Sequence, residues 1–209
     1  MLVRLVAERA TGALLRDCGT LYLAEGSVVH AESPAAPGLD VLLAVAGRLR
    51  GRDWQQTVDV AGPLGVGRFL VESGQVSTGE LELCHTGALH DAAFFALAPG
   101  SSPTRFRYGT AHWIGDVRPV PVRVVAREAA RRRELLNRLW PDPGIDTAPV
   151  VPARPREGLR LTARQRALLT LADGERTPRE LARLLGRPAF HTLVDVRRLA
   201  VAGAVEAAW

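Results

Sequence analysis

The stretch TARQRALLTLADGERTPRELARLLGRP, residues 162–188, contains two helix starts in close succession. Thr162 and Gln165 form one capping-box pair, and Thr177 and Glu180 form the next. In this pattern the threonine hydroxyl accepts a hydrogen bond from the backbone N–H three residues on, and the Gln or Glu side chain accepts one from the backbone N–H of the threonine. Both helix starts are therefore fixed locally. The sequence predicts two short helices separated by a tight turn.

A third helix and a strand complete this C-terminal segment. Pro188 begins a helix that runs to about Ala202, and AVEAAW, residues 204–209, is typical of a strand. Leucines at helical spacing give the first two helices an apolar face: Leu168, Leu169, Leu181, Leu184 and Leu185. Three short helices and a strand predict a winged-helix or helix-turn-helix domain over residues 159–209.

Nine residues of this segment fit the pattern DG-x-R-T-x-x-[ED]-L-A-x-x-L-G. They are Asp173, Gly174, Arg176, Thr177, Glu180, Leu181, Ala182, Leu185 and Gly186. The segment thereby resembles winged-helix modules over its whole length, and the resemblance implies their architecture. The matching residues fix a turn and a helix cap, and none of them reads bases.

The third helix would be the recognition helix of such a domain. Its outer face carries His191, Asp195 and Arg198, which is a small set for reading base edges because one of the three is a carboxylate. If DNA is bound, we expect Arg187, His191, Thr192 and Arg198 nearest to it, with Arg176 and Arg179 on its backbone. A protein partner for the same architecture stays open as the alternative.

The N-terminal half contains a second informative stretch, GTLYLAEGSVVHA, residues 19–31. Apolar runs at 13–15, 21–23 and 28–31 are separated by the turn-like RDCG and AEG, which predicts a three-stranded antiparallel meander. Periodicity and caps predict helices over residues 2–9, 39–46 and 120–140, and further strands over 104–109 and 112–117.

This stretch fits the pattern G-x-[LI]-Y-[FL]-x-x-G-x-[IV]-V-H-A. The matching residues are Gly19, Leu21, Tyr22, Leu23, Gly26, Val28, Val29, His30 and Ala31, preceded by Thr11 and Gly12. Residues 1–140 thereby resemble the N-terminal domain of PatA-type bacterial regulators. The resemblance implies a signalling or scaffolding domain and brings no catalytic residue. We interpret His30 and Tyr22 as hydrogen-bonded or packed structural residues.

A shorter stretch, VGRFLVESGQVSTGEL, residues 66–81, partly resembles the N-terminal domain of pilus and secretion assembly ATPases, whose motif begins a cyclic di-GMP site. Gly65 stands where that motif has arginine, and Ala88 where it has its closing glutamine. The planar phosphate donor is therefore missing. We expect helical packing here without the nucleotide, with Ser77 and Glu80 as a capping box.

Residues 141–158, PDPGIDTAPVVPARPREG, hold five prolines and no periodic pattern. They are predicted to be a semi-extended linker. The expected fold class is therefore α+β: a small antiparallel sheet with packed helices over residues 1–140, a Pro-rich linker over 141–158, and a winged-helix domain over 159–209.

The chain is basic, and all 27 of its basic residues are arginine, against 22 acidic residues. A net charge of +5 favours an anionic partner such as nucleic acid. The coding bias of a GC-rich genome would produce the same arginine usage and the same high pI. The absence of lysine excludes a Walker A loop, a pyridoxal enzyme and a protein kinase, because each needs one.

Motifs for catalysis and metal binding are missing. His85 and His90 are five residues apart, about 140° on a helix, so they do not share a metal as an i, i+4 pair does. Cys-x-x-Cys, His-Glu-x-x-His and Gly-x-Ser-x-Gly do not occur. We expect no enzymatic activity, no cofactor and no metal.

The expected location is the cytoplasm. Cys18 and Cys84 make no disulfide framework, and the start MLVRLVAERATG carries charges where a secretory signal needs its apolar segment. No apolar run approaches the ~20 residues that a membrane span requires.

These observations predict a non-enzymatic bacterial regulator, with an N-terminal sensing or dimerisation domain and a DNA-binding winged helix that acts in transcription. The alternative is a signalling adaptor whose two domains bind proteins, such as a small GTPase or a kinase system. A protein partner or a homodimer is expected.

Overall fold

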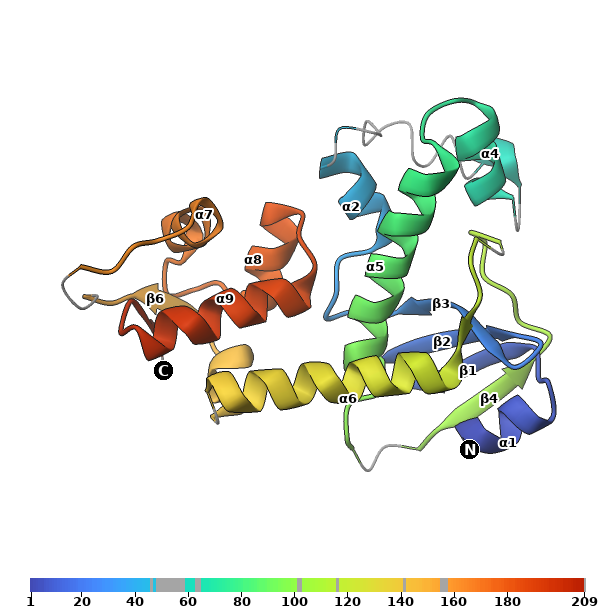
Figure 1. Ribbon diagram of the computed structural model, residues 1–209, viewed down its shortest axis with the longest axis horizontal. Coiled ribbons are helices and arrows are strands. Elements are labelled where there is room, and N and C mark those ends of the chain that lie inside the picture. Colours follow the sequence, from blue (N-terminus) through green and yellow to red (C-terminus); the bar gives the residue numbers. More distant parts are fainter. Residues whose placement is uncertain are drawn as a thin grey trace. The chain divides into compact units, whose positions relative to one another are not determined.

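The computed structural model describes residues 1–45, 47, 59–62, 65–100, 103–115, 117–140, 142–154 and 158–208. The chain divides into two compact units, Met1–Ala129 (unit 1) and Ala130–Trp209 (unit 2). Within the described residues, unit 1 contains a five-stranded antiparallel sheet, and unit 2 contains short helices with a two-stranded sheet (Figure 1). The predicted α+β class is confirmed. No helix of the described ranges is both long and apolar enough to cross a bilayer.

The sheet of unit 1 has the strand order β4–β1–β2–β3–β5. β1 (Gly12–Arg16), β2 (Gly19–Ala24) and β3 (Ser27–Glu32) form the predicted antiparallel meander. β4 (Arg105–Tyr108) pairs with β1, which confirms the strand predicted over 104–109, and β5 (Val120–Pro121) pairs with β3.

The prediction of a strand over residues 112–117 is wrong. The described part of this stretch forms a turn in which the Gly115 N–H donates to the His112 carbonyl at 3.2 Å. Gly115 has φ of 75°, a left-handed conformation that glycine adopts without strain and that interrupts an extended strand. The alternating apolar pattern there therefore reflects a buried turn.

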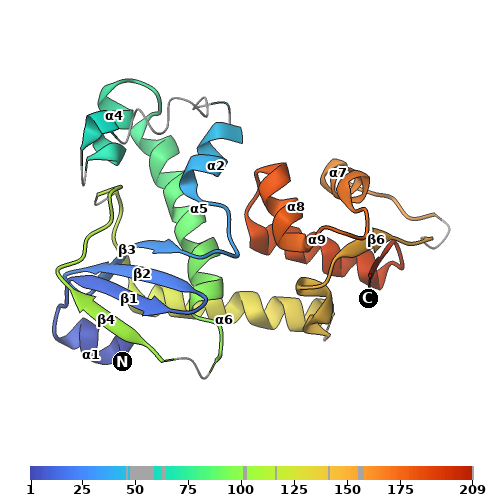
Figure 2. The same ribbon diagram turned by 180° about the vertical axis from the view of Figure 1, so that it is seen from behind.

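The helices of unit 1 are α1 (Leu2–Ala7), α2 (Leu39–Val45), α4 (Val66–Glu72) and α5 (Thr78–Ala96). α5 begins at the predicted Ser77–Glu80 capping box and packs against β2 and β3. α2 and α4 lie beside its N-terminal half in both views (Figures 1 and 2). One apolar cluster joins these three helices; it includes Leu39, Leu43, Val66, Leu70 and Leu81. α6 (Val122–Leu139), also predicted, contains the boundary between the units.

Unit 2 contains α7 (Ala163–Leu171), α8 (Pro178–Leu185), α9 (Ala189–Val201) and β7 (Val205–Ala207). The capping boxes that open α7 and α8 are both confirmed, and Gly186 ends α8 in a left-handed conformation. The core of the unit includes Leu168, Leu181, Val196 and Leu199. Leu184 departs from the prediction, because its side chain is 59% exposed rather than facing that core.

The stretch predicted to be a linker contains regular structure in its described part, residues 142–154. A 3-10 helix, η1 (Pro143–Asp146), precedes β6 (Val150–Pro152), which pairs antiparallel with β7. Val150 also exchanges two backbone hydrogen bonds with the loop between α7 and α8: its N–H donates to the Arg176 carbonyl, and its carbonyl accepts from the Gly174 N–H. β6 therefore lies between β7 and this loop. The high proline content indicated a linker, but proline is tolerated at strand ends and so did not exclude a three-residue strand.

Candidate functional site

The six residues predicted to lie at DNA differ in their exposure. His191 and Arg198 are exposed on α9, and Arg179 is exposed on α8. Arg176 and Arg187 are half-buried; Arg187 donates to the Arg164 carbonyl at 3.4 Å, and Arg176 pairs with Asp173 at 2.7 Å. Thr192 requires a correction. It is buried and its hydroxyl donates to the Pro188 carbonyl, because it lies on the inner side of α9 and not on the outer face.

Cations surround the start of α9. The Arg132 guanidinium lies 4.7 Å from the Phe190 ring centroid. Burial, followed by the charges of Arg132 and Arg164, lowers the pKa of His191, against an opposing effect of Asp195. The electrostatic potential at this end of the helix is therefore positive, and His191 is neutral at neutral pH. Sequence reasoning placed Arg187 and His191 here but missed Arg132 and Arg164.

The net charge of the chain is concentrated in unit 2. Residues 130–209 contain 15 arginines and nine acidic residues, a net charge of +6. Residues 1–129 contain 12 arginines and 13 acidic residues, a net charge of −1. The basic character of the protein is thus a property of unit 2 alone.

Arg197 is buried, although its neighbour Arg198 is exposed; the Arg197 side chain is only 2% exposed. Its Nε and Nη2 donate to the two carboxylate oxygens of Asp146 at 2.8 and 2.6 Å. Its Nη1 donates to the carbonyls of Leu136 (2.8 Å) and Trp140. Carbonyls at the C-terminal end of a helix lack partners within the helix, and the Leu136 carbonyl accepts the Trp140 N–H as well. The guanidinium therefore caps α6 while it pairs with η1. Arg197 therefore joins α6, η1 and α9.

Unit 1 contains a cluster of three buried histidines that come from separate parts of the chain. His30 lies on β3, His85 on α5, and His112 at the turn that precedes β5. His30 Nδ1 is 3.1 Å from His85 Nε2, and the rings of His30 and His112 are stacked with centroids 4.0 Å apart. No short motif connects the three residues, so their meeting could not be predicted from the sequence.

A β-bulge in β3 positions His30. The register passes from the pair Leu23–Val28 to the pair Tyr22–His30, which leaves Val29 as the extra residue. Without it Val28 and His30 would share one face, because side chains alternate along a strand. With it, Val28 shares the face of Leu23, and His30 shares that of Tyr22. The bulge thus brings the imidazole toward α5.

Glu32, which also lies on β3, accepts hydrogen bonds from two side chains. His112 Nδ1 accepts from the Ile114 N–H at 3.2 Å, so the neutral ring carries its proton on Nε2 and donates to Glu32 Oε1 at 2.9 Å. The Tyr22 hydroxyl donates to Oε2, also at 2.9 Å. The His112 hydrogen bond, aided by Tyr22, lowers the pKa of Glu32 against the opposing effect of burial. Burial and the Glu32 charge raise the pKa of Tyr22 to about 12. Glu32 is therefore an ionised carboxylate in a fixed orientation.

His30, Glu32 and His112 each offer one metal-ligand atom, and these atoms lie within 4.8 Å of one another. Their chemistry suits Zn²⁺, but the geometry does not. A metal ion lies in the plane of each imidazole that binds it, and the stacked rings of His30 and His112, inclined by only 24°, lack a shared in-plane position. A ligating histidine also donates from its second nitrogen, whereas His112 Nδ1 accepts the Ile114 N–H. We assign no metal to this cluster.

Acid should destabilise unit 1 through its buried histidines. Burial, with the charges of His112 and His85, lowers the pKa of His30 to about 2. Burial and the His112 charge, opposed by the Val29 carbonyl, lower the pKa of His85 to about 4. In the unfolded chain both groups take up a proton near pH 6.5, so below that pH the unfolded state binds more protons and stability falls. Each histidine contributes up to about 1.4 kcal/mol per pH unit between about pH 6 and its folded pKa.

Urea unfolding between pH 7 and pH 4 measures this slope. The variant His85→Gln carries no titrating ring at that position, so its stability should fall less steeply with acid than that of the wild type. Val3→Gln, which changes an exposed side chain of α1 without adding or removing an ionisable group, serves as the control and should keep the wild-type slope. Equal slopes for wild type and His85→Gln would contradict the assignment.

No protein-family model, curated protein or solved structure matches this chain. The PatA-type and winged-helix resemblances therefore stay predictions that rest on the residues quoted for them.

Proposed function

We propose that the protein is a non-enzymatic regulator that binds DNA through unit 2, with unit 1 as its sensing or dimerisation domain. The division of charge carries the proposal: +6 in residues 130–209 against −1 in residues 1–129. A genome-wide coding bias would raise the arginine content of both units without separating their net charges. Charge asymmetry between the parts of a chain is typical of nucleic-acid binding.

The arrangement of helices in unit 2 supports this proposal. α8 and α9 are joined by a tight turn at Gly186, as the two helices of a helix-turn-helix are. The same unit contains the antiparallel pair of β6 and β7. We interpret the unit as a winged-helix variant in which β6, which precedes α7 in the chain, replaces one strand of the usual C-terminal hairpin.

The exposed groups favour phosphate contacts over base reading. His191 and Arg198 are the exposed polar residues of α9, and Arg164 and Arg187 belong to the surrounding helices and turn. With so few groups available to base edges, most of the affinity is expected to come from the DNA backbone. Such binding is strongly salt-dependent and weakly sequence-specific.

Fluorescence anisotropy with a labelled DNA duplex tests the proposal. If Arg164, Arg187 and Arg198 each neutralise one phosphate, log K should fall with log salt at a slope of about −3, roughly a 40-fold loss between 50 and 200 mM salt. The double variant Arg187→Ala/Arg198→Ala should reduce this slope by about two. Arg4→Ala/Arg118→Ala removes the same charge from unit 1 and should leave it unchanged. Absence of binding at 50 mM salt would reject the proposal.

One observation favours the adaptor as the second candidate. Leu184 on α8 and Val201 on α9 are both exposed, which gives these helices apolar surface that DNA phosphates do not need. A pull-down from lysate with and without nuclease separates the candidates. A protein that is retained after nuclease treatment, together with no binding to purified duplex, would support the adaptor.

A further inference from the structure

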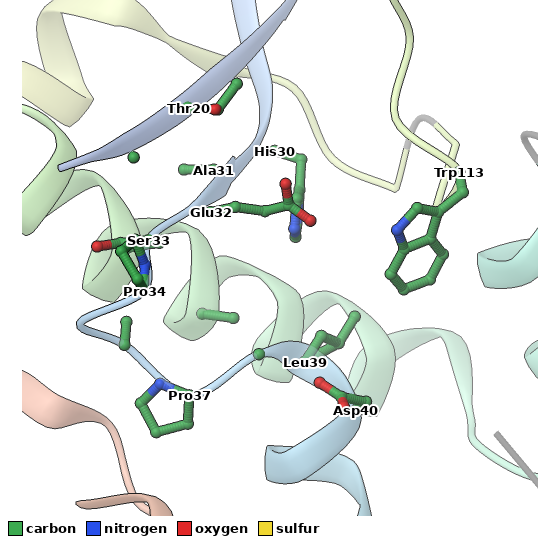
Figure 3. Close-up of a pocket in the computed structure, with 15 residues that line it drawn as sticks. Thr20, His30, Ala31, Glu32, Ser33, Pro34, Pro37, Leu39, Asp40 and Trp113 are labelled. Carbon is green, nitrogen blue, oxygen red and sulfur yellow. The ribbon is translucent and has the colours of Figure 1, made fainter. Parts of the chain in front are cut away.

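A cavity of about 390 Å³ lies beside the histidine cluster of unit 1 (Figure 3). Its walls come from the start of β2, the end of β3, the segment 33–38, the start of α2, the middle of α5, and Trp113. Alanine, proline and leucine side chains supply most of the apolar lining, among them Ala31, Ala36, Pro37, Leu39, Ala88 and Ala92. Its volume falls in the range of small-molecule sites, which combine such walls with a few polar groups.

The charged groups of the lining are two carboxylates, Glu32 and Asp40. Arginine is absent from the described residues that line the cavity, although the chain has 27 arginines. Each Glu32 oxygen already accepts one hydrogen bond, but a carboxylate oxygen accepts two, and the Glu32 side chain is 46% exposed. Glu32 therefore keeps acceptor capacity on its open side. The cavity favours positive charge and repels anions.

Two further groups point to a ligand. His30 is 4% exposed and uses Nδ1 on His85, so Nε2 is the ring nitrogen left for the cavity it lines. Because its ring is neutral, it adds a hydrogen-bonding group without repelling a cation. Trp113 adds an aromatic face, which attracts cations through its quadrupole. Figure 3 shows His30, Glu32, Asp40 and Trp113 around a common space.

We propose that this cavity binds a small organic cation that carries a protonated amino group. The ammonium donates hydrogen bonds to Glu32 and Asp40 and lies against the indole of Trp113, while the carbon chain contacts the alanine and leucine walls. A bare metal ion gains no binding energy from apolar walls, and the stacked rings of His30 and His112 offer it no common ligand position. The proposal concerns unit 1 alone and does not depend on whether unit 2 binds DNA.

The test titrates the full-length protein with butane-1,4-diamine and, separately, with butane-1,4-diol, a neutral molecule of nearly the same shape. The readout is the indole N–H resonance of Trp113 in ¹H–¹⁵N NMR spectra, assigned with the variant Trp113→Phe. The diamine should shift this resonance in a saturable manner, and the diol should not. Glu32→Gln keeps the shape of the side chain but removes its charge, so it should weaken diamine binding at least about tenfold. Glu72→Gln removes an exposed charge from α4 and should leave binding unchanged.

Three results would overturn the proposal: no shift up to about 10 mM diamine, equal shifts with the diol, or equal affinities for wild type and Glu32→Gln. Circular dichroism first establishes that Glu32→Gln is folded. If it is not, Asp40→Asn removes the other carboxylate of the cavity, and the same tenfold criterion applies to it.

Discussion

Replacing Arg197 with methionine should lower the free energy of unfolding of unit 2 by about 3–5 kcal/mol, the usual effect of removing one partner of a buried ion pair. Asp146, whose side chain is 18% exposed, would keep its charge without a counterion. The Trp140 carbonyl would lose this donor, and the Leu136 carbonyl would keep only the Trp140 N–H. The loss is larger than that of a single hydrogen bond because Asp146 and the Trp140 carbonyl lose their partner together.

Hydrogen exchange of the α9 amides in the full-length protein measures this change, since it reports unit 2 separately from unit 1. Arg198→Met alters the adjacent, exposed arginine and should stay within about 0.5 kcal/mol of the wild type. Arg197→Lys should fall between the two, because an ammonium keeps the charge but does not form the bidentate pair. Equal stabilities for the methionine variants at 197 and 198 would show that the buried pair does not hold the unit together.

These neighbouring arginines also show where prediction from sequence stops. The starts of α7 and α8 were predicted residue by residue, because a threonine and the Gln or Glu three residues on suffice to make a capping box. Which side of α9 faces inward depends instead on η1 and the end of α6, which lie more than 50 residues earlier in the chain. The sequence prediction gave Arg197 no role and placed Thr192 near DNA, whereas the structure buries both side chains.

In the histidine cluster of unit 1, too, the local structure was predictable and the tertiary contacts were not. The meander was predictable, since turn residues separate its apolar runs. His30 was interpreted as a hydrogen-bonded or packed structural residue, and in the structure it is buried with Nδ1 3.1 Å from His85 Nε2. Its partners His85 and His112 come from a helix and a turn, and the bulge that orients it lies at Val29, a residue type that gives no sign of irregularity. The acidic cavity depends on the same tertiary contacts, and the sequence predicted none of it.

Gly19→Ala should destabilise unit 1 by about 3 kcal/mol or more, from backbone strain together with overpacking. Gly19 has φ of 148°, and a Cβ placed there would lie 2.2 Å from the backbone oxygen of Glu32 and 3.0 Å from Ala96 Cβ. Neither neighbour moves easily, because the oxygen belongs to a paired strand and Ala96 to the end of α5. Relieving this steric overlap would require β2 and β3 to separate at the edge of the cavity. Urea unfolding of the full-length variant, followed by circular dichroism, measures the loss.

Gly74→Ala is the matched control, because it makes the same substitution where only the backbone conformation matters. Gly74 has φ of 71°, and a Cβ there would meet nothing within 4 Å, so about 1–2 kcal/mol of left-handed strain is expected and no clash. The difference between the two variants isolates the close approach of Gly19 to Glu32. Since that approach fixes the backbone of the cavity's carboxylate, Gly19→Ala should also weaken diamine binding, whereas Gly74→Ala should not. Equal losses of stability for both variants would mean that the two strands do not approach this closely.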